Sequence, residues 1–177
     1  MKLLLDANVL FSAVLRDLFL TLCENEIVSL FWSAEILDET TRNLQRRIGV
    51  SAKSTEKLVR AINTYFPDAM VAGYEPLIEK MKNHPGDRHV AAAASAIGAD
   101  VIVSNNLKHF KNLPQGIRAA TPDEILLEIH AVAPTKIVRT LRKRSEELKR
   151  PPMAWDEYLA VLGKSVPRFA ARLRDDG

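Results

Sequence analysis

The chain has 177 residues, enough for one ordinary domain with a small appendage, and its 47% hydrophobic content is ample for a core. It has one cysteine, no apolar run long enough to cross a membrane and no signal-like N-terminus, so we expect a disulfide-free, cytoplasmic protein. The net charge of +3 is uneven, because residues 131–177 hold 11 Lys and Arg against 6 Asp and Glu, whereas residues 1–130 hold 14 against 16. A basic tail of this kind indicates a polyanionic or acidic partner, although solvated helix faces would give the same pattern.

Short β-prone runs alternate with helical spacing along the first 130 residues. The runs predict strands at 3–5, 28–31, 69–72, 101–104 and 117–120, and the spacing predicts helices at 9–24, 33–47, 51–66, 74–81 and 88–97. Ser33 and Thr121 are placed to begin helices, and Gly98 is placed to end one. The alternation indicates an α/β domain with a mostly parallel sheet and helices on both faces.

The pattern changes at Pro134, after which every segment predicts helix. Three apolar stripes follow at helical spacing, and we place a boundary between a main domain at 1–130 and a small all-helical extension at 134–177. The stripes comprise Ile137, Leu141 and Leu148, then Trp155, Tyr158, Leu159 and Leu162, then Val166, Phe169, Ala170 and Leu173.

Polar side chains follow two of the predicted strands. Asp6 and Asn8 come after the first strand, and Ser104 and Asn106 come after the fourth. In an open parallel sheet, ligands bind beyond the carboxyl ends of the strands, where the winding direction reverses. These residues therefore predict a polar crevice suited to a hard cation.

Two further carboxylates are candidates for this crevice. Asp87 directly precedes an alanine-rich helix, and Glu39 lies on the helix after the second strand. Taken singly, Asp6 and Asp87 could be helix caps and Glu39 an ordinary exposed carboxylate. Three carboxylates brought together would repel one another, and a bound Mg²⁺ or Mn²⁺ would resolve the repulsion. Such a centre favours phosphodiester hydrolysis.

The four histidines stand at positions 84, 89, 109 and 130 without a His-x-x-x-His pair, so the spacing does not predict a zinc site. His89 and His109 either approach the acidic site or are ordinary packed or solvated histidines.

Five motifs in order resemble the PIN-domain nucleases, and among them most closely the VapC-type toxins of toxin-antitoxin pairs. They are LLDANVL at 4–10, EILDE at 35–39, GDRHVAAAA at 86–94, ADVIVSNN at 99–106 and HF at 109–110. The helical extension resembles the extra C-terminal domain of some of those toxins. The resemblance implies a three-layer fold with a five-stranded parallel sheet in the order 3-2-1-4-5.

The resemblance also implies roles for five residues. Asp6, Glu39 and Asp87 match the family's metal ligands, and Ser104 matches a Ser or Thr that holds the first aspartate or a metal-bound water. Asn106 stands where the family often has a fourth acid. We therefore expect one tightly held Mg²⁺ (or Mn²⁺), with a second ion recruited, if at all, with substrate.

By the same resemblance, the expected function is a Mg²⁺-dependent endoribonuclease that leaves 5′-phosphate and 3′-hydroxyl ends. It would be the toxin of a type II toxin-antitoxin system that inhibits translation, and its antitoxin would insert a segment into the acidic crevice. Two alternatives stay open: an RNA-processing nuclease, and a non-catalytic RNA-binding or scaffold PIN protein, which the neutral Asn106 motivates. A homodimer, common in the family, is also left open.

Basic residues that could hold RNA phosphates form two groups. Arg42, Arg46 and Arg47 follow Glu39, and the second group, Arg139, Arg142 and Lys143, lies in the helical extension. Such contacts position phosphates without reading base sequence. Ordinary solvated helix faces are the alternative for both groups.

Overall fold

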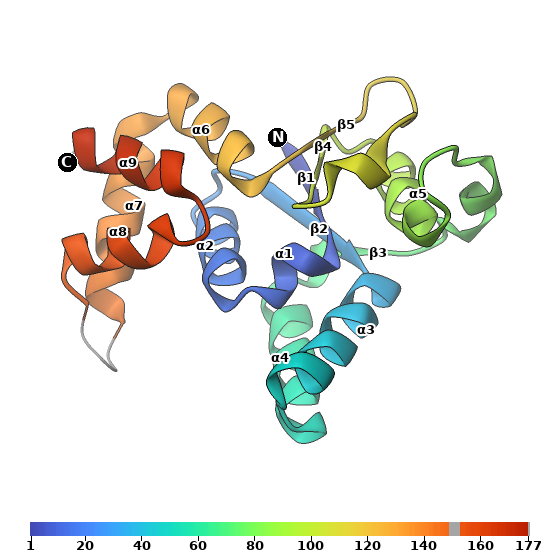
Figure 1. Cartoon of the computed structure of the whole chain (residues 1–177), viewed down its shortest axis with the longest axis horizontal. Coiled ribbons are helices and arrows are strands. Elements are labelled where there is room, and N and C mark those ends of the chain that lie inside the picture. The colour runs from blue at the N-terminus through green and yellow to red at the C-terminus, as the bar shows by residue number, and fades with distance from the viewer. Residues whose placement is uncertain (149–152, 177) are drawn as a thin grey trace.

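A computed structural model describes residues 1–148 and 153–176 and contains a five-stranded, all-parallel sheet in the order β3-β2-β1-β4-β5 (Figure 1). The predicted sheet order and the α/β class are thus confirmed. The strands are β1 (Lys2–Leu5), β2 (Ser29–Ser33), β3 (Met70–Val71), β4 (Val101–Val103) and β5 (Arg118–Ala120).

Helices connect the strands and continue beyond the last one. They are α1 (Ala7–Phe11), α2 (Ala13–Glu24), α3 (Ala34–Asn43), α4 (Ala52–Tyr65), α5 (Arg88–Ile97), α6 (Pro122–Val132), α7 (Pro134–Glu147), α8 (Trp155–Gly163) and α9 (Pro167–Asp175). No helix in the described part of the chain is long and apolar enough to cross a membrane.

The predicted caps are confirmed. The Ser33 hydroxyl accepts a hydrogen bond from the Ile36 amide at 3.2 Å, and Gly98 ends α5 with a φ of 59°. Thr121 and Glu124 form a reciprocal capping box at the start of α6. These local bonds fix where each helix meets the sheet.

Three predicted helices differ in detail. The segment 9–24 is interrupted by Ser12, which is extended and caps α2 by accepting from the Leu15 amide. The segment 33–47 ends as a wider π-helical turn, Leu44–Ile48, before the left-handed Gly49. The segment 74–81 is a 3₁₀ helix, Glu75–Lys80, because a proline in its first turn and its short length favour the tighter winding.

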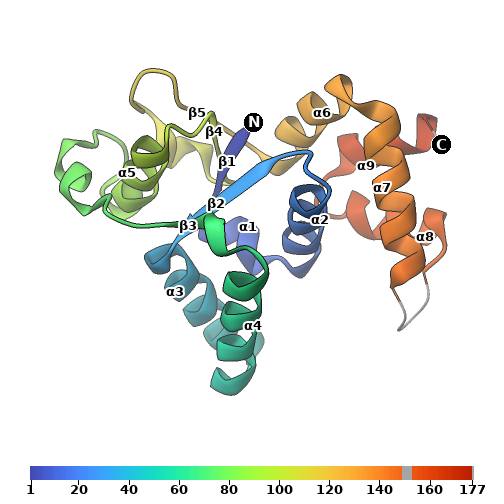
Figure 2. The ribbon, with the colours of Figure 1, turned by 180° about the vertical axis from the view of Figure 1, so that it is seen from behind.

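The core lies on both sides of the central strand β1. Leu3, Leu4 and Leu5 are all 0% exposed, as expected for a parallel strand covered on both faces. Helix α2 lies on one side of the strands and α5 on the other (Figures 1 and 2). The buried alanines 91–94 let α5 approach the sheet closely.

The winding direction reverses between β1 and β4, because β2 and β3 lie on one side of β1, and β4 and β5 lie on the other. Leu5 pairs with Val103 in register, so Asp6 and Ser104 emerge side by side. The two strand ends at which the sequence predicted a polar crevice are therefore adjacent.

Helices α6 to α9 gather at the end of the molecule opposite α5 (Figure 1). Asp123 of α6 accepts from the Phe169 amide at 2.9 Å and so caps α9. Arg144 of α7 makes a two-pronged ion pair with Asp17 of α2, with Nε 3.1 Å from Oδ2. Helix α6 thus packs with the later helices, whereas the sequence placed the boundary after it; that boundary stays a prediction.

Candidate metal centre

Asp6 lies at the carboxyl end of β1 and is 4% exposed. Its Oδ2 accepts from the Ser104 hydroxyl at 2.6 Å and from the Asn8 amide nitrogen. Although Asp6 occupies the N-cap position of α1, its side chain makes no cap hydrogen bond. The carboxylate is therefore positioned for the crevice rather than for helix capping.

The environment of Asp6 disfavours its ionised form. Burial raises the pKa of Asp6 from 3.8 to about 6, the Ser104 hydrogen bond opposes the rise, and the charges of Asp87 and Glu39 add to it. Asp87 and Glu39 thus both lie within electrostatic reach of Asp6.

A small network fixes the rim between β1 and β4. The Ser104 hydroxyl accepts from the Asn8 amide nitrogen and from the Asn106 backbone amide, each at 3.0 Å. The side-chain oxygen Oδ1 of Asn8 accepts from the Asn105 backbone amide at 3.0 Å. Ser104 therefore lies against Asp6, and Asn106 adjoins both Ser104 and the 3₁₀ turn Leu107–Phe110.

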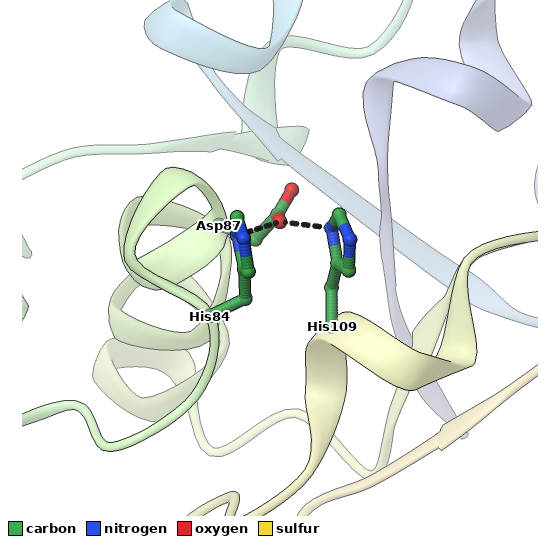
Figure 3. A group of neighbouring side chains, drawn as sticks. All are labelled: His84, Asp87 and His109. Carbon is green, nitrogen blue, oxygen red and sulfur yellow. Dashed lines mark hydrogen bonds and ion pairs between the residues drawn. The ribbon is translucent and has the colours of Figure 1, made fainter.

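Asp87 also occupies an N-cap position, that of α5, without a side-chain cap hydrogen bond. Its Oδ2 instead lies 2.7 Å from Nδ1 of His109 and 3.4 Å from Nδ1 of His84 (Figure 3). Asn106 Nδ2 lies 2.8 Å from the same His109 nitrogen. The Asp87 carboxylate therefore lies beside two imidazoles, with His109 within hydrogen-bond distance.

Glu39 lies on α3 with 41% of its side chain exposed. His89 is 8% exposed and lies close to it, with Nε2 4.0 Å from a Glu39 oxygen and Nδ1 3.9 Å from a Glu35 oxygen. Nε2 of His89 is buried without a hydrogen-bond partner among the described residues. His89 therefore separates two acidic side chains of α3.

The predicted RNA-binding residues divide between two places. Arg42 pairs with Asp38 at 3.1 Å, and Arg46 and Arg47 are exposed on the π-helical turn beyond α3. The second group, Arg139, Arg142 and Lys143, lies on α7, at the opposite end of the molecule from α5 (Figure 1). Arg142 lies over the Trp155 ring, 4.7 Å from its centroid.

From the sequence, His84 was counted among the histidines but not placed at the site, and the role of His109 was left open. They stand 25 positions apart, so no spacing motif could join them. A partial indication was present in the sequence, because each histidine is close in sequence to a predicted site residue: His84 opens the HPGD segment that carries Asp87, and His109 follows Asn106 by three positions.

Comparison with known proteins gives the family. Residues 2–108 match the family model described as "PIN domain". The chain belongs to the PIN-domain family. Residues 122–175 match a second model, described as "VapC50 C-terminal domain", so the PIN domain is followed by the kind of extension that the sequence predicted.

One curated relative of this PIN-domain chain is the "Putative ribonuclease VapC50" of Mycobacterium tuberculosis, which is 38% identical over 109 residues. The match covers 60% of this chain and 64% of the relative. The chain therefore spans somewhat less than two thirds of that relative in the aligned region. No solved structure matches the chain.

Proposed function

We propose that this protein is a divalent-metal-dependent endoribonuclease, and that it is the toxin of a type II toxin-antitoxin pair acting in the cytoplasm. The observation that carries the proposal is the buried Asp6 carboxylate, whose pKa is raised in part by the nearby charges of Asp87 and Glu39. The PIN-domain match and the relative named as a ribonuclease support it.

The donor set fits a hard cation. Asp6 is desolvated and faces two further negative charges, so its ionised form lacks a compensating positive charge within this set. Carboxylate oxygens are ligands that Mg²⁺ and Mn²⁺ prefer. Asp6, Glu39 and Asp87 would hold the ion, which when bound polarises a phosphoryl oxygen and acidifies a coordinated water.

The chain's own residues would orient this centre. Ser104 and Asn8 bind one Asp6 oxygen and leave the other for the crevice. Asn106, a neutral amide at the rim, adds no fourth charge, and we infer that a single Mg²⁺ is held tightly. Exposed Arg46 and Arg47, one turn beyond α3, would bind flanking phosphates, with the α7 residues Arg139, Arg142 and Lys143 serving only a longer RNA.

The test is cleavage of cellular RNA by the purified chain with Mg²⁺ and with chelator. We expect cleavage that stops with chelator, and a loss of at least about 100-fold in Asp6→Asn. Glu39→Gln should lower the rate, whereas Asp38→Asn, which removes a neighbouring exposed carboxylate of the same helix, should not. Cleavage that persists in chelator, or an Asp6→Asn chain as fast as the wild type, would contradict the proposal.

Two further outcomes separate the related functions. RNA that is bound but never cut would favour the non-catalytic reading that Asn106 motivates. A chain that cuts RNA without arresting growth on expression, and has no adjacent antitoxin gene, would favour a processing nuclease. An antitoxin would supply a cationic side chain to the carboxylates of Asp6, Glu39 and Asp87. A homodimer would show as a doubled mass in sedimentation.

A further inference from the structure

His84, Asp87 and His109 form a compact cluster beside the three-carboxylate centre (Figure 3). Their ligand atoms all lie within 4.8 Å of one another. The two imidazole rings stack in parallel, with centroids 4.0 Å apart and planes 11° apart, and both Nδ1 atoms face the same Asp87 oxygen. Three potential donor atoms from two separate segments thus lie close together.

Backbone hydrogen bonds hold the cluster together without any ion. The His84 amide donates to the His109 carbonyl at 3.0 Å, and the Asp87 amide donates to the His84 carbonyl at 2.9 Å. Asn83, 4% exposed, donates from its side chain to the Asp87 carbonyl at 3.0 Å. The backbone of the cluster is therefore fixed without an ion. Because an imidazole lone pair lies in the ring plane and the two planes are almost parallel, the half-exposed His84 ring would have to turn for both rings to bind one ion.

The Nδ1 atom of His84 carries no proton, although it lies beside the Asp87 carboxylate. The Gly86 backbone amide can only donate, and it donates to Nδ1 of His84 at 3.2 Å. That nitrogen therefore carries a lone pair rather than a proton, and it faces Asp87 Oδ2 at 3.4 Å. Two electron-rich atoms at this separation gain nothing from each other. Their spacing is close to the distance of about 3.3 Å between two ligands on one tetrahedral zinc ion, and an ion bound there would take the His84 lone pair from the Gly86 amide.

His109 meets a similar conflict. Its Nδ1 lies within hydrogen-bond distance of both Asp87 Oδ2 and Asn106 Nδ2. One ring nitrogen cannot donate to the carboxylate and accept from the amide at the same time. A cation at this point would bind the lone pairs of the imidazole and the carboxylate together.

We propose that His84, Asp87 and His109 bind a late first-row divalent ion such as Zn²⁺, at a site distinct from the all-oxygen Mg²⁺ centre but sharing Asp87 with it. Two imidazole nitrogens and one carboxylate select zinc, cobalt or nickel over magnesium. The histidine spacing did not predict zinc, since the fold alone brings His84 and His109 together. This proposal concerns metal binding and does not depend on RNA cleavage.

The experiment is a titration of the untagged chain with Co²⁺, followed by its visible absorption, and then displacement with Zn²⁺. With a large excess of Mg²⁺ present to fill the carboxylate centre, we expect one Co²⁺ per chain and a visible band that Zn²⁺ removes. His84→Gln and His109→Gln should each weaken binding at least about 10-fold. Lys108→Ala, an exposed neighbour of His109, should bind as the wild type does.

Asp6→Asn separates the two sites, because it removes an oxygen ligand of the Mg²⁺ centre and leaves the histidine cluster intact. The cobalt band should survive in this variant even though cleavage is lost. His84 is half exposed, so its substitution tests the site without disturbing the core. Absence of a band, displacement of Co²⁺ by Mg²⁺, or a band that survives both histidine substitutions would overturn the proposal.

Discussion

Asp6→Asn provides a test of the electrostatics of the metal-free crevice. The rise in the pKa of Asp6 from 3.8 to about 6 means that its ionised form is less favourable in the folded chain than in the unfolded one. At about 1.4 kcal/mol per pH unit, this costs about 3 kcal/mol of folding free energy at pH 8. The asparagine removes the charge and therefore that cost.

The hydrogen bonds of Asp6 reduce the net gain. Ser104 and Asn8 both donate to the same oxygen, so an asparagine carbonyl oxygen in that place keeps both bonds in weaker, uncharged form. The nearby Ala7 amide also favours the ionised carboxylate by lowering the pKa of Asp6, and loss of this contribution with the new amide group costs about 1 kcal/mol. We expect Asp6→Asn to stabilise the chelator-treated chain by about 1–2 kcal/mol, raising Tm by about 2–8 °C.

Thermal unfolding at pH 8 in chelator, and again with Mg²⁺, measures this effect. Mg²⁺ should raise the Tm of the wild type and leave that of Asp6→Asn nearly unchanged. Ser104→Ala is the control, because it removes a donor that favours the ionised carboxylate and should destabilise the metal-free chain. A lower Tm for Asp6→Asn than for the wild type in chelator would refute the reasoning.

Two predictions concern the C-terminal helices. Burial lowers the pKa of His130, although Asp176 lies 3.0 Å from its Nε2. The unfolded chain therefore takes up the proton first, and the stability of the fold should fall as pH drops below about 6.5. In Tm scans from pH 7.5 to 5.5, His130→Gln should flatten this loss. Arg144→Ala removes the ion pair to Asp17 between α7 and α2, and should lower the free energy of unfolding in urea by about 1–2 kcal/mol.

Each of these two predictions has a matched control. The pH series is best made in the Asp6→Asn background, because the raised pKa of Asp6 gives stability the opposite slope, increasing as pH falls through 6. If His130→Gln leaves the dependence of Tm on pH unchanged, groups other than His130 cause the loss of stability at low pH. Lys143→Ala breaks only an exposed pair to Glu147 and should cost less than about 0.5 kcal/mol; an equal loss in both variants would contradict the role of Arg144.

Much of the fold follows from local features of the sequence. The central strand 3–5, the Ser33, Gly98 and Thr121 caps and the three apolar stripes after Pro134 were all identifiable, because hydrophobic periodicity and capping act over only a few residues. Asp6 and Ser104 could be placed at one rim because each follows a predicted strand and the carboxyl ends of parallel strands lie at the same edge of the sheet. The sheet order came from the family resemblance rather than from any local signal.

The tertiary structure decided what the side chains at that rim contact. Asp6 and Asp87 both occupy N-cap positions, and only the fold turns them from their helices toward Ser104 and His109. It also brings His84 to His109 and puts the basic residues of α7 at the far end of the molecule. Such contacts depend on strand register and on how loops return to the sheet, and interactions between distant residues leave no periodic trace in the sequence.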